Sequence, residues 1–395
     1  MNIQKKAIIT LCVLLFLSIS LYPQEEKVKK TYFSAEELFN PEEFRNMLIP
    51  AATFFQRQLL PLASWEQIDE LLTRRTEETL PPELDYRQLG LVSPVKDQGQ
   101  GACWVFSAIG TVESTIMKQN GGQVVDLSEE EISSCHPMGE TAGIEHYAFS
   151  YILRKGIASE ANYPWHTYDS VCHPPAQPDY FINDYHILNV SFLPLADRVR
   201  ALKILLLKNG PVSTGFTVYT EFFDYKGQNV YVWTGDQRLE GGHAVVIVGW
   251  KDDAAVVNGG YWICKNSWSE NWGENGFFRI AYGQLGIDDI VEYVSFDPDD
   301  SAPIFRIKGG IYYLQAGHTI HLEISARSNR GAAIVYCAEN LPRGAIYDAE
   351  SGNFSWTPDG SQLGAFAIRF SANDGLCTTS KEFTFIISNY FQDSD

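Results

Sequence analysis

Residues 97–107 read DQGQGACWVFS and place a cysteine between a tight loop and an apolar segment. Gly99 and Gly101 have no side chain, so the backbone can turn sharply just before Cys103. The stretch predicts a loop, a cysteine and a helix, in that order. A loop followed by a helix start is a position at which a cysteine can act as a nucleophile.

The helix is predicted by the residues that follow the cysteine. Apolar residues recur at positions 105, 109, 112 and 116, and the sequence Asn-Gly-Gly at 120–122 is a typical helix end. Cys103 is therefore expected in the first turn of a core-facing helix, where unpaired N–H groups and the helix dipole favour a thiolate. A cysteine alone in such a place is more often a buried core residue, so the assignment depends on partners elsewhere in the chain.

The stretch resembles the nucleophile loop of papain-like cysteine proteases, with KDQG at 96–99 and GACWVFS at 101–107. Upstream, LDYR at 84–87 and VSPV at 92–95 resemble the start of the mature enzymes of that family. One departure lies between Gln98 and Cys103. The family has one more residue there, a cysteine, so Gln98 precedes Cys103 here by five positions instead of six.

Two later segments resemble the family's histidine and asparagine segments. His243 lies in GGHAV at 241–245, and Asn266 lies in KNSW at 265–268. A single histidine in an apolar strand is more often a core residue, but the order Cys103, His243, Asn266 agrees with the family. The resemblance covers about residues 82–296.

The resemblance implies a role for each of these residues. Cys103, as a thiolate beside a protonated His243, is expected to attack a peptide carbonyl. Asn266 is expected to orient the imidazole, with Trp268 shielding their hydrogen bond. The side-chain amide of Gln98 and the backbone N–H of Cys103 are expected to form an oxyanion hole, in which one donor typically contributes about 3 kcal/mol.

The resemblance also implies the substrate site. Its expected residues are Gly143, Ile144, Gly215, Gly242, Ala244 and Trp268. Small residues around Ile144 predict an apolar S2 pocket that admits a bulky hydrophobic P2 side chain. No insertion of the kind found in exopeptidases is evident, so an endopeptidase is expected, by analogy with the fold and the family.

Composition bounds the other possibilities. The chain has 395 residues, a formal net charge of −19 and 45% hydrophobic residues. The length predicts two domains, and the negative charge argues against non-specific nucleic-acid binding. No His and Cys spacing suits zinc and no phosphate-binding loop is present, so neither a metal nor a cofactor is expected.

The N-terminus resembles a secretory signal peptide over residues 1–22, with Lys5 and Lys6 before an apolar run at 7–21. The alternative is an uncleaved signal anchor. In either case the rest of the chain is expected outside the cytoplasm, secreted or periplasmic. Residues 23–80, with helical patterns at 35–47 and 65–73, are expected to be a propeptide or, alternatively, a plain N-terminal extension.

Six cysteines follow the leader, in a compartment where disulfides persist. Cys135 and Cys172 lie in contexts that resemble paired positions of the papain-like family, so a bridge between them is expected. Cys264 lies in an apolar strand and is expected to be a buried thiol. For Cys337 and Cys377 the sequence leaves pairing open.

The expected fold class is α+β: a papain-like domain over 81–297, with a helical left lobe and an antiparallel β right lobe. Helices are predicted at 146–155 and 196–208, and strands at 212–218, 243–250, 260–265, 276–281 and 290–296. A linker at 298–303 precedes residues 304–395. These resemble the cadherin-like, immunoglobulin-like β-sandwich modules of bacterial secreted proteins, with strands expected at 304–307, 319–326, 333–338, 366–372 and 382–388.

The expected function is a secreted, papain-like cysteine endopeptidase acting on proteins or peptides through a thioester. A cell-surface or matrix ligand is a candidate partner of its module, and no membrane segment is expected after signal cleavage. Two alternatives stay open. One is an impaired papain-like binding or adhesion protein, and the other is an acyl transferase similar to transglutaminases.

Overall fold

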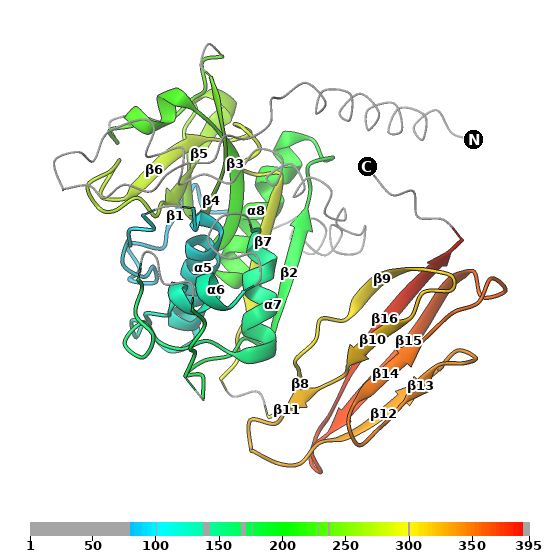
Figure 1. Cartoon of the computed structure of the whole chain (residues 1–395). Helices are drawn as coiled ribbons and strands as arrows, with labels where there is room; N and C mark the ends of the chain where they lie inside the picture. The colour runs from blue at the N-terminus through cyan, green and yellow to red at the C-terminus, as the bar shows by residue number, and fades with distance from the viewer. Residues whose placement is uncertain are drawn as a thin grey trace, which may run out of the picture.

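The computed structural model describes residues 80–99, 101–136, 143–166, 171–175, 177–227, 229–235, 238–298 and 301–389. These residues form a larger domain of helices and a sheet, and a smaller all-β module beside it (Figure 1). The predicted signal peptide and most of the predicted N-terminal extension lie outside the described residues.

Helix α5, Cys103–Gln119, is the central element of the larger domain. The chain enters it through Gly99 and Gly101, whose φ angles of 62° and 76° are positive, as the predicted tight loop requires. Asn120 follows the helix, and the N–H of Gly122 closes its end on the carbonyl of Met117 at 2.8 Å. Every residue from Cys103 to Met117 is buried, so α5 is enclosed by the domain.

Three further helices accompany α5: α6, Glu129–Cys135; α7, Glu145–Lys155; and α8, Leu195–Asn209. Helices α7 and α8 agree with the predictions to within one residue, and each is followed by a glycine with positive φ. The sequence analysis did not predict α6. Its cap is Ser128, whose hydroxyl accepts a hydrogen bond from the N–H of Glu131 at 3.0 Å.

The sheet of the larger domain has seven strands in the described part of the chain, in the order β2-β7-β3-β4-β5-β6, with β1 paired to β4. Their bounds are Glu83–Asp85 (β1), Asp184–Asn189 (β2), Val212–Tyr219 (β3), Leu239–Asp252 (β4), Gly260–Lys265 (β5), Phe277–Ala281 (β6) and Ile290–Ser295 (β7). The strand pairs of this sheet are antiparallel, as predicted. Short 3₁₀ turns lie at Thr220–Asp224 (η1) and Val257–Gly259 (η2).

The larger domain has two main apolar cores, which correspond to its two lobes. One surrounds α5 and α7, and the other lies between α8 and the sheet. Ala244 of β4 belongs to the helical core and its neighbour Val245 to the sheet core. Strand β4 therefore borders both lobes.

The module is built from nine short strands in the residues that the structure describes. They are Ile304–Phe305 (β8), Gly310–Gln315 (β9), Ile320–Glu323 (β10), Ala326–Arg327 (β11), Val335–Glu339 (β12), Ile346–Tyr347 (β13), Asn353–Trp356 (β14), Gly364–Asn373 (β15) and Thr378–Ser388 (β16). Strands β12, β15, β16 and β9 form one sheet, in which β9 pairs with β16 in parallel. The five predicted strand regions contain strands, whereas β9, β13 and β14 were not predicted. Cys337 and Cys377 form no disulfide.

The module contacts β2 of the larger domain through charged groups. Asp184 accepts hydrogen bonds from Lys308 at 2.9 Å and from Lys381 at 3.2 Å. Phe181, just before β2, lies under the guanidinium groups of Arg306 and Arg327, at 5.5 and 4.5 Å from the ring centre. The two domains are thus joined by side-chain contacts as well as by the chain.

Candidate active site

Cys103 is the first residue of α5 and is fully buried. One turn later on the same helix face, the hydroxyl of Ser107 donates to the carbonyl of Val245 in β4 at 2.7 Å. Val245 lies two residues after His243. The helix face that begins with Cys103 therefore packs on the part of β4 that carries His243.

His243 and Asn266 are brought together from β4 and from the end of β5. The His243 Nε2 and Asn266 Oδ1 atoms are 2.7 Å apart, and the N–H of Ser267 also donates to that Oδ1 at 2.8 Å. The indole of Trp268 stacks on the imidazole, with ring centres 4.6 Å apart and planes inclined by 26°. Trp268 therefore covers the hydrogen-bonded pair.

These contacts fix the state of the imidazole. Because Asn266 Oδ1 already accepts from Ser267, we assign it as an acceptor toward His243 as well, so that Nε2 carries the proton. Nδ1 is then the basic nitrogen. It is buried and, within the described part of the chain, has no hydrogen-bond partner.

Burial lowers the pKa of His243 to about 4, and the hydrogen bond to Asn266 offsets this only in part. The imidazole is therefore neutral near pH 7 in this arrangement. Removal of the ring from water therefore disfavours the charged imidazolium in this arrangement. Cys103 and His243 are both 0% exposed, so neither side chain is open to solvent in this closed arrangement.

Gln98 is held beside Asn266 by Ser267. The N–H of Gln98 donates to the carbonyl of Ser267 at 2.9 Å, and the hydroxyl of Ser267 donates to Gln98 Oε1 at 2.5 Å. Since Oε1 is used as an acceptor, the amide nitrogen of Gln98 is turned away from Ser267. The shorter loop thus keeps Gln98 buried and anchored. The sequence analysis missed the anchoring role of Ser267, for which a hydroxyl directly after Asn266 was the available signal.

The predicted substrate residues lie around the same part of β3 and β4. Gly215 pairs with Ala244, and Gly242 pairs with Thr217. Gly143 lies against the indole of Trp104, where an added Cβ would be 2.3 Å from a ring carbon, so the close approach requires glycine. Ile144 is buried just before α7.

Two buried carboxylates next to this pocket were not expected. Glu145 directly follows Ile144, and its Oε1 accepts from the hydroxyl of Ser213 at 3.1 Å. Ser213 points to the same face of β3 as Gly215 and pairs with Glu292 of β7. Both glutamates are 0% exposed. The surroundings of the predicted pocket are therefore not purely apolar, and a charged residue within the apolar strand 290–295 was the sequence signal for this.

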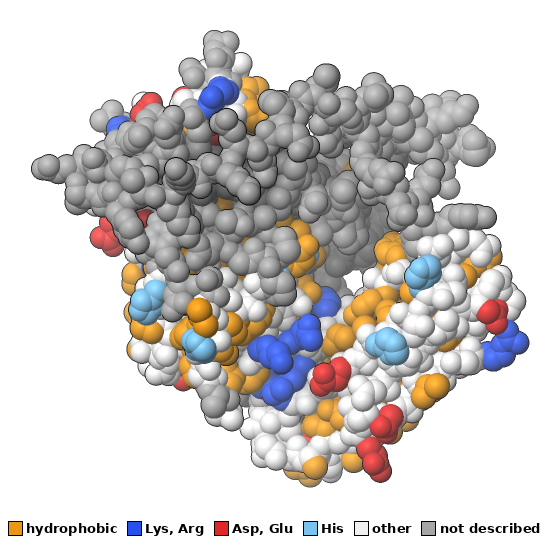
Figure 2. Space-filling view, viewed as in Figure 1, with side chains coloured by type: hydrophobic (Ala, Val, Ile, Leu, Met, Phe, Trp, Pro, Cys, Tyr) orange, Lys and Arg blue, Asp and Glu red, His pale blue; other side chains and the backbone are white. Residues whose placement is uncertain are grey.

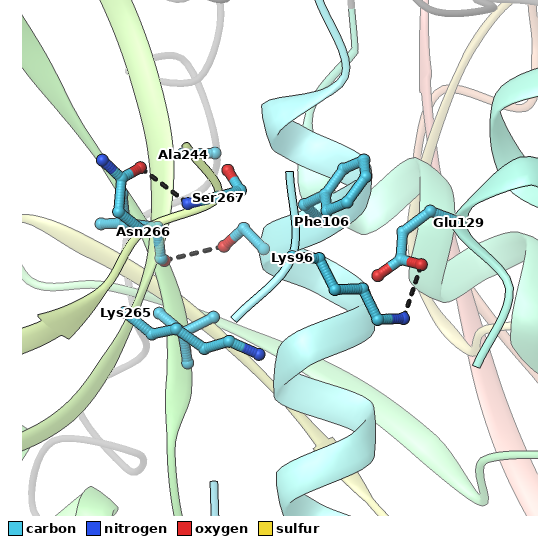
Figure 3. A pocket seen from close by; sticks show the side chains of 10 residues that line it. Lys96, Phe106, Glu129, Ala244, Lys265, Asn266 and Ser267 are labelled. Atoms are coloured by element: carbon cyan, nitrogen blue, oxygen red, sulfur yellow. Dashed lines mark hydrogen bonds and ion pairs between the residues drawn. The ribbon is translucent and has the colours of Figure 1, made fainter. Parts of the chain in front are cut away.

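A network of buried charges lies behind the site, beside a cavity of about 10 Å³ that has room for about one water molecule (Figure 3). Lys265, next to Asn266, donates to Ser93 at 2.8 Å, and Ser93 donates to Glu113 at 2.5 Å. Lys96 contacts Glu113 at 3.3 Å and Glu129 at 2.7 Å. Burial lowers the pKa of Lys265, whereas Glu113 raises it. The network links the segments that carry Asn266 and Gln98 to helix α5.

Other predicted features can be located directly. Cys135 and Cys172 form a disulfide in the structure, and Cys264 is a buried thiol outside any disulfide. Burial raises the pKa of that thiol well above its ordinary value.

In the described ranges no group of three or more His, Cys, Asp or Glu is placed to hold a metal ion. Over the same ranges, no helix combines the length and the apolar character needed to cross a bilayer.

The fold is that of papain-like cysteine peptidases, and comparison with known families agrees. The family model described as papain family cysteine protease matches residues 80–295, and a putative Ig domain matches residues 305–388. The chain belongs to the papain family of cysteine proteases. It also carries a C-terminal Ig-like domain.

Curated relatives match over the larger domain. The chain is 34% identical over 214 residues to cysteine endopeptidase RepA of rice, covering 52% of this chain and 53% of RepA. It is 32% identical over 232 residues to rat cathepsin J, covering 56% of this chain and 66% of that protein. The chain thus spans about half to two thirds of the length of these relatives.

Two solved structures of proforms share the fold. Procathepsin L2 from Tenebrio molitor matches with a TM-score of 0.55 and 27% identity, covering 74% of this chain and 90% of that structure. The proform of the ragweed pollen cysteine protease Amb a 11 matches with a TM-score of 0.54 and 25% identity, covering 72% of this chain and 86% of that structure.

Proposed function

We propose that this protein is a secreted cysteine endopeptidase that hydrolyses peptide bonds through Cys103, His243 and Asn266. The observation that carries the proposal is the state of His243. Its Nε2 is hydrogen-bonded to Asn266, its ring is covered by Trp268, and its basic Nδ1 is buried without a hydrogen-bond partner among the described residues. A histidine held in this way can accept a proton from a thiol.

In the proposed reaction, Nδ1 of His243 takes the thiol proton of Cys103 as the sulfur attacks the peptide carbonyl carbon. The carbonyl oxygen becomes an oxyanion, for which the Cys103 N–H and the amide nitrogen of Gln98 are the proposed donors. The C–N bond then breaks, and His243 transfers its proton to the departing amine. Water attacks the resulting thioester, with His243 again accepting a proton, and the thiol is restored.

We further propose that the closed arrangement is a latent form and that residues 23–80 are a propeptide. Two observations support this. Cys103 and His243 are fully buried, whereas a working site must admit substrate. The two proform structures cover 74% and 72% of the chain, which is more than the residues 80–295 that the family model matches. The disulfide between Cys135 and Cys172 supports a site of action outside the cytoplasm.

The test is labelling of the processed protein with an irreversible epoxide that reacts with papain-type thiols, followed by peptide mapping. Labelling is expected at Cys103 and is expected to be lost in His243→Ala. Cys264→Ala is the matched control, because it removes the other buried thiol of the larger domain and should leave labelling intact. A folded, processed protein that takes no label would favour the binding-protein alternative.

Product analysis in the presence of an added amine separates hydrolysis from acyl transfer. Hydrolysis gives a free carboxylate product, whereas transfer gives an amide of a different mass. A dominant amide product at millimolar amine would replace the peptidase proposal with an acyl transferase.

A further inference from the structure

A polar cleft of about 400 Å³ lies between the larger domain and the module. The lining residues that matter for its charge are Arg154, Lys155, Tyr185, Arg306, Lys308 and Glu323. Figure 2 shows Lys and Arg side chains gathered beside the hollow that separates the two domains. The volume is within the range of small-ligand sites.

The cleft is basic although the chain as a whole carries a charge of −19. Arg154 and Lys155 come from the last turn of α7, and Arg306 and Lys308 come from the segment between β8 and β9. Glu323 is the carboxylate of the lining. Lys308 is paired with Asp184. Like charges held together repel one another, so such a cluster in an acidic protein indicates an anionic ligand.

Three of these cations lack a carboxylate partner. Among the described residues, Arg154, Lys155 and Arg306 form no ion pair, and Glu323 forms none with them. The Nε atom of Arg306 is buried and has no hydrogen-bond partner within that part of the chain. An unpaired donor of this kind normally costs free energy unless something binds to it.

The two walls of the cleft are held in place by other contacts. Lys308 donates to Asp184 and to the carbonyl of Tyr185 at 2.5 Å, and Lys381 also bonds Asp184. The guanidinium of Arg306 lies over the ring of Phe181. These contacts position Lys308 and Arg306 before any ligand arrives, so the cost of ordering these two side chains on binding is small.

We propose that this cleft binds a tetrahedral oxyanion, a phosphate or sulfate group, that bridges the two domains. The cations come from both domains, and a tetrahedral oxyanion has three or more acceptor oxygens to share among them, compared with the two oxygens of a carboxylate. Arg154 and Arg306 offer the guanidinium fork that such oxyanions favour. The group is carried either by a soluble molecule or by the headgroup of a lipid surface.

The proposal is tested on the full chain with its active-site thiol blocked by Cys103→Ala. Pyrophosphate binding is measured by titration calorimetry, and surface binding is measured by co-sedimentation with vesicles that contain phosphatidic acid, against neutral phosphatidylcholine vesicles. Pyrophosphate binding that the double variant Arg154→Gln, Lys155→Gln weakens at least tenfold supports a soluble ligand. Binding to the acidic vesicles alone, lost in the same variant, supports a lipid headgroup.

Two further variants keep the test decisive. Arg369→Gln removes an exposed cation of the module outside the cleft and should leave binding unchanged. Arg306→Lys keeps the charge but removes the fork, and should weaken binding severalfold. Binding that is equal in the wild type and the double variant, binding that Arg369→Gln weakens as much, or no binding to either probe would overturn the proposal, as would stronger binding of an acidic peptide.

Discussion

The two domains bury different kinds of side chain. In the larger domain, Glu113, Glu129 and Lys265 are nearly or fully buried and linked to one another through Ser93 and Lys96. In the module, the buried polar residues of the described range 301–389 are Gln362 and Asp374. Its core is aromatic, with Phe354, Trp356, Phe370, Phe383 and Phe385 in mutual contact.

This difference separates two ways of stabilising a domain. The module depends on apolar area removed from water, which pH hardly changes. The larger domain depends also on buried pairs, in which the loss of one partner leaves the other unpaired. Buried polar groups are then expected where a site must hold polar side chains in fixed positions. The predictions below test that expectation.

The largest effect is expected for the thiol of Cys103. Under the proposed function, Cys103→Ala should lower kcat/KM for a peptide substrate by at least about 10⁴-fold, because the nucleophile is removed. Cys264→Ala should cost about 1 kcal/mol of unfolding free energy and leave kcat/KM nearly unchanged. Progress curves and thermal unfolding of both variants check this. Similar kcat/KM values for the two would show that Cys103 is another packing residue.

Single core substitutions should cost similar free energies in the two domains for different reasons. Phe385→Ala should destabilise the module by about 3–5 kcal/mol through lost burial and a cavity. Glu113→Ala should destabilise the larger domain by about 3–5 kcal/mol, because Lys96 loses an ion-pair partner and Ser93, which binds Lys265, loses its acceptor. Hydrogen exchange read separately for each domain measures both.

The matched control for this pair is Glu113→Gln, which retains an acceptor for the N–H of Leu127 and should cost less than Glu113→Ala. Equal losses for the two variants would mean that packing, and not hydrogen bonding, explains the effect of Glu113.

Acid should weaken the larger domain through His243. Its folded pKa of about 4 lies below the ordinary value of 6.5, so the unfolded chain binds the proton more tightly. The stabilising contribution is complete above pH 6.5 and is lost as the pH falls to 4, by about 3 kcal/mol. Glu129 acts in the opposite direction, because burial raises its pKa despite Lys96. The contribution of His243 is therefore measured as a difference between two variants. The slope of unfolding free energy against pH is compared in Cys103→Ala and in the double variant Cys103→Ala, His243→Gln.

The module should remain nearly flat over the same pH range. A hydrogen bond from the N–H of Cys377 lowers the pKa of its buried Asp374 to about 2, which is below that range. Stability curves from pH 4 to 7, measured by denaturant unfolding, check both domains. A module that weakened as steeply as the larger domain would remove the contrast between them.

The smallest effect concerns the substrate pocket. If the carboxylate of Glu145 faces the P2 side chain, Glu145→Gln should lower kcat/KM for a P2 arginine substrate relative to its P2 leucine counterpart by about tenfold. Ser107→Ala, which removes a hydroxyl bonded to Ser213, is the control and should change both substrates alike. An unchanged ratio in Glu145→Gln would support the purely apolar pocket predicted from the sequence.

Local patterns predicted much of the larger domain. The spacing of apolar residues placed α5, α7 and α8, and alternation with Gly and Asn turns placed the main strands. Strand β2 and helix α6 were missed. Helix α6 was missed because it is short and strongly acidic at its start. In the module, β9 was missed because its partner β16 lies far along the chain and pairs in parallel. No local pattern encodes such a partner.

The residues of the candidate site were predicted better than the contacts that hold them in place. Cys103, His243 and Asn266 stand in recognisable segments, whereas the role of Ser267 depends on a contact made across the fold. The charged network was missed because Lys and Glu are usually exposed. The sequence held one signal of the network. Glu113 lies four residues after Ile109, so it falls on the apolar face of the predicted helix. The basic cleft was not predicted, because its two walls come from different domains and lie far apart in the sequence.

Helix α7 takes part in two regions of the molecule, one at each end. Glu145 starts it beside the predicted pocket, and Arg154 and Lys155 finish it in the basic cleft. Its 11 residues span about 16 Å as one rigid rod. Inserting a single residue would turn one end by about 100° relative to the other. The length of this helix is therefore constrained more tightly than the identity of its exposed residues, and relatives that keep both regions should vary here by substitution and not by insertion.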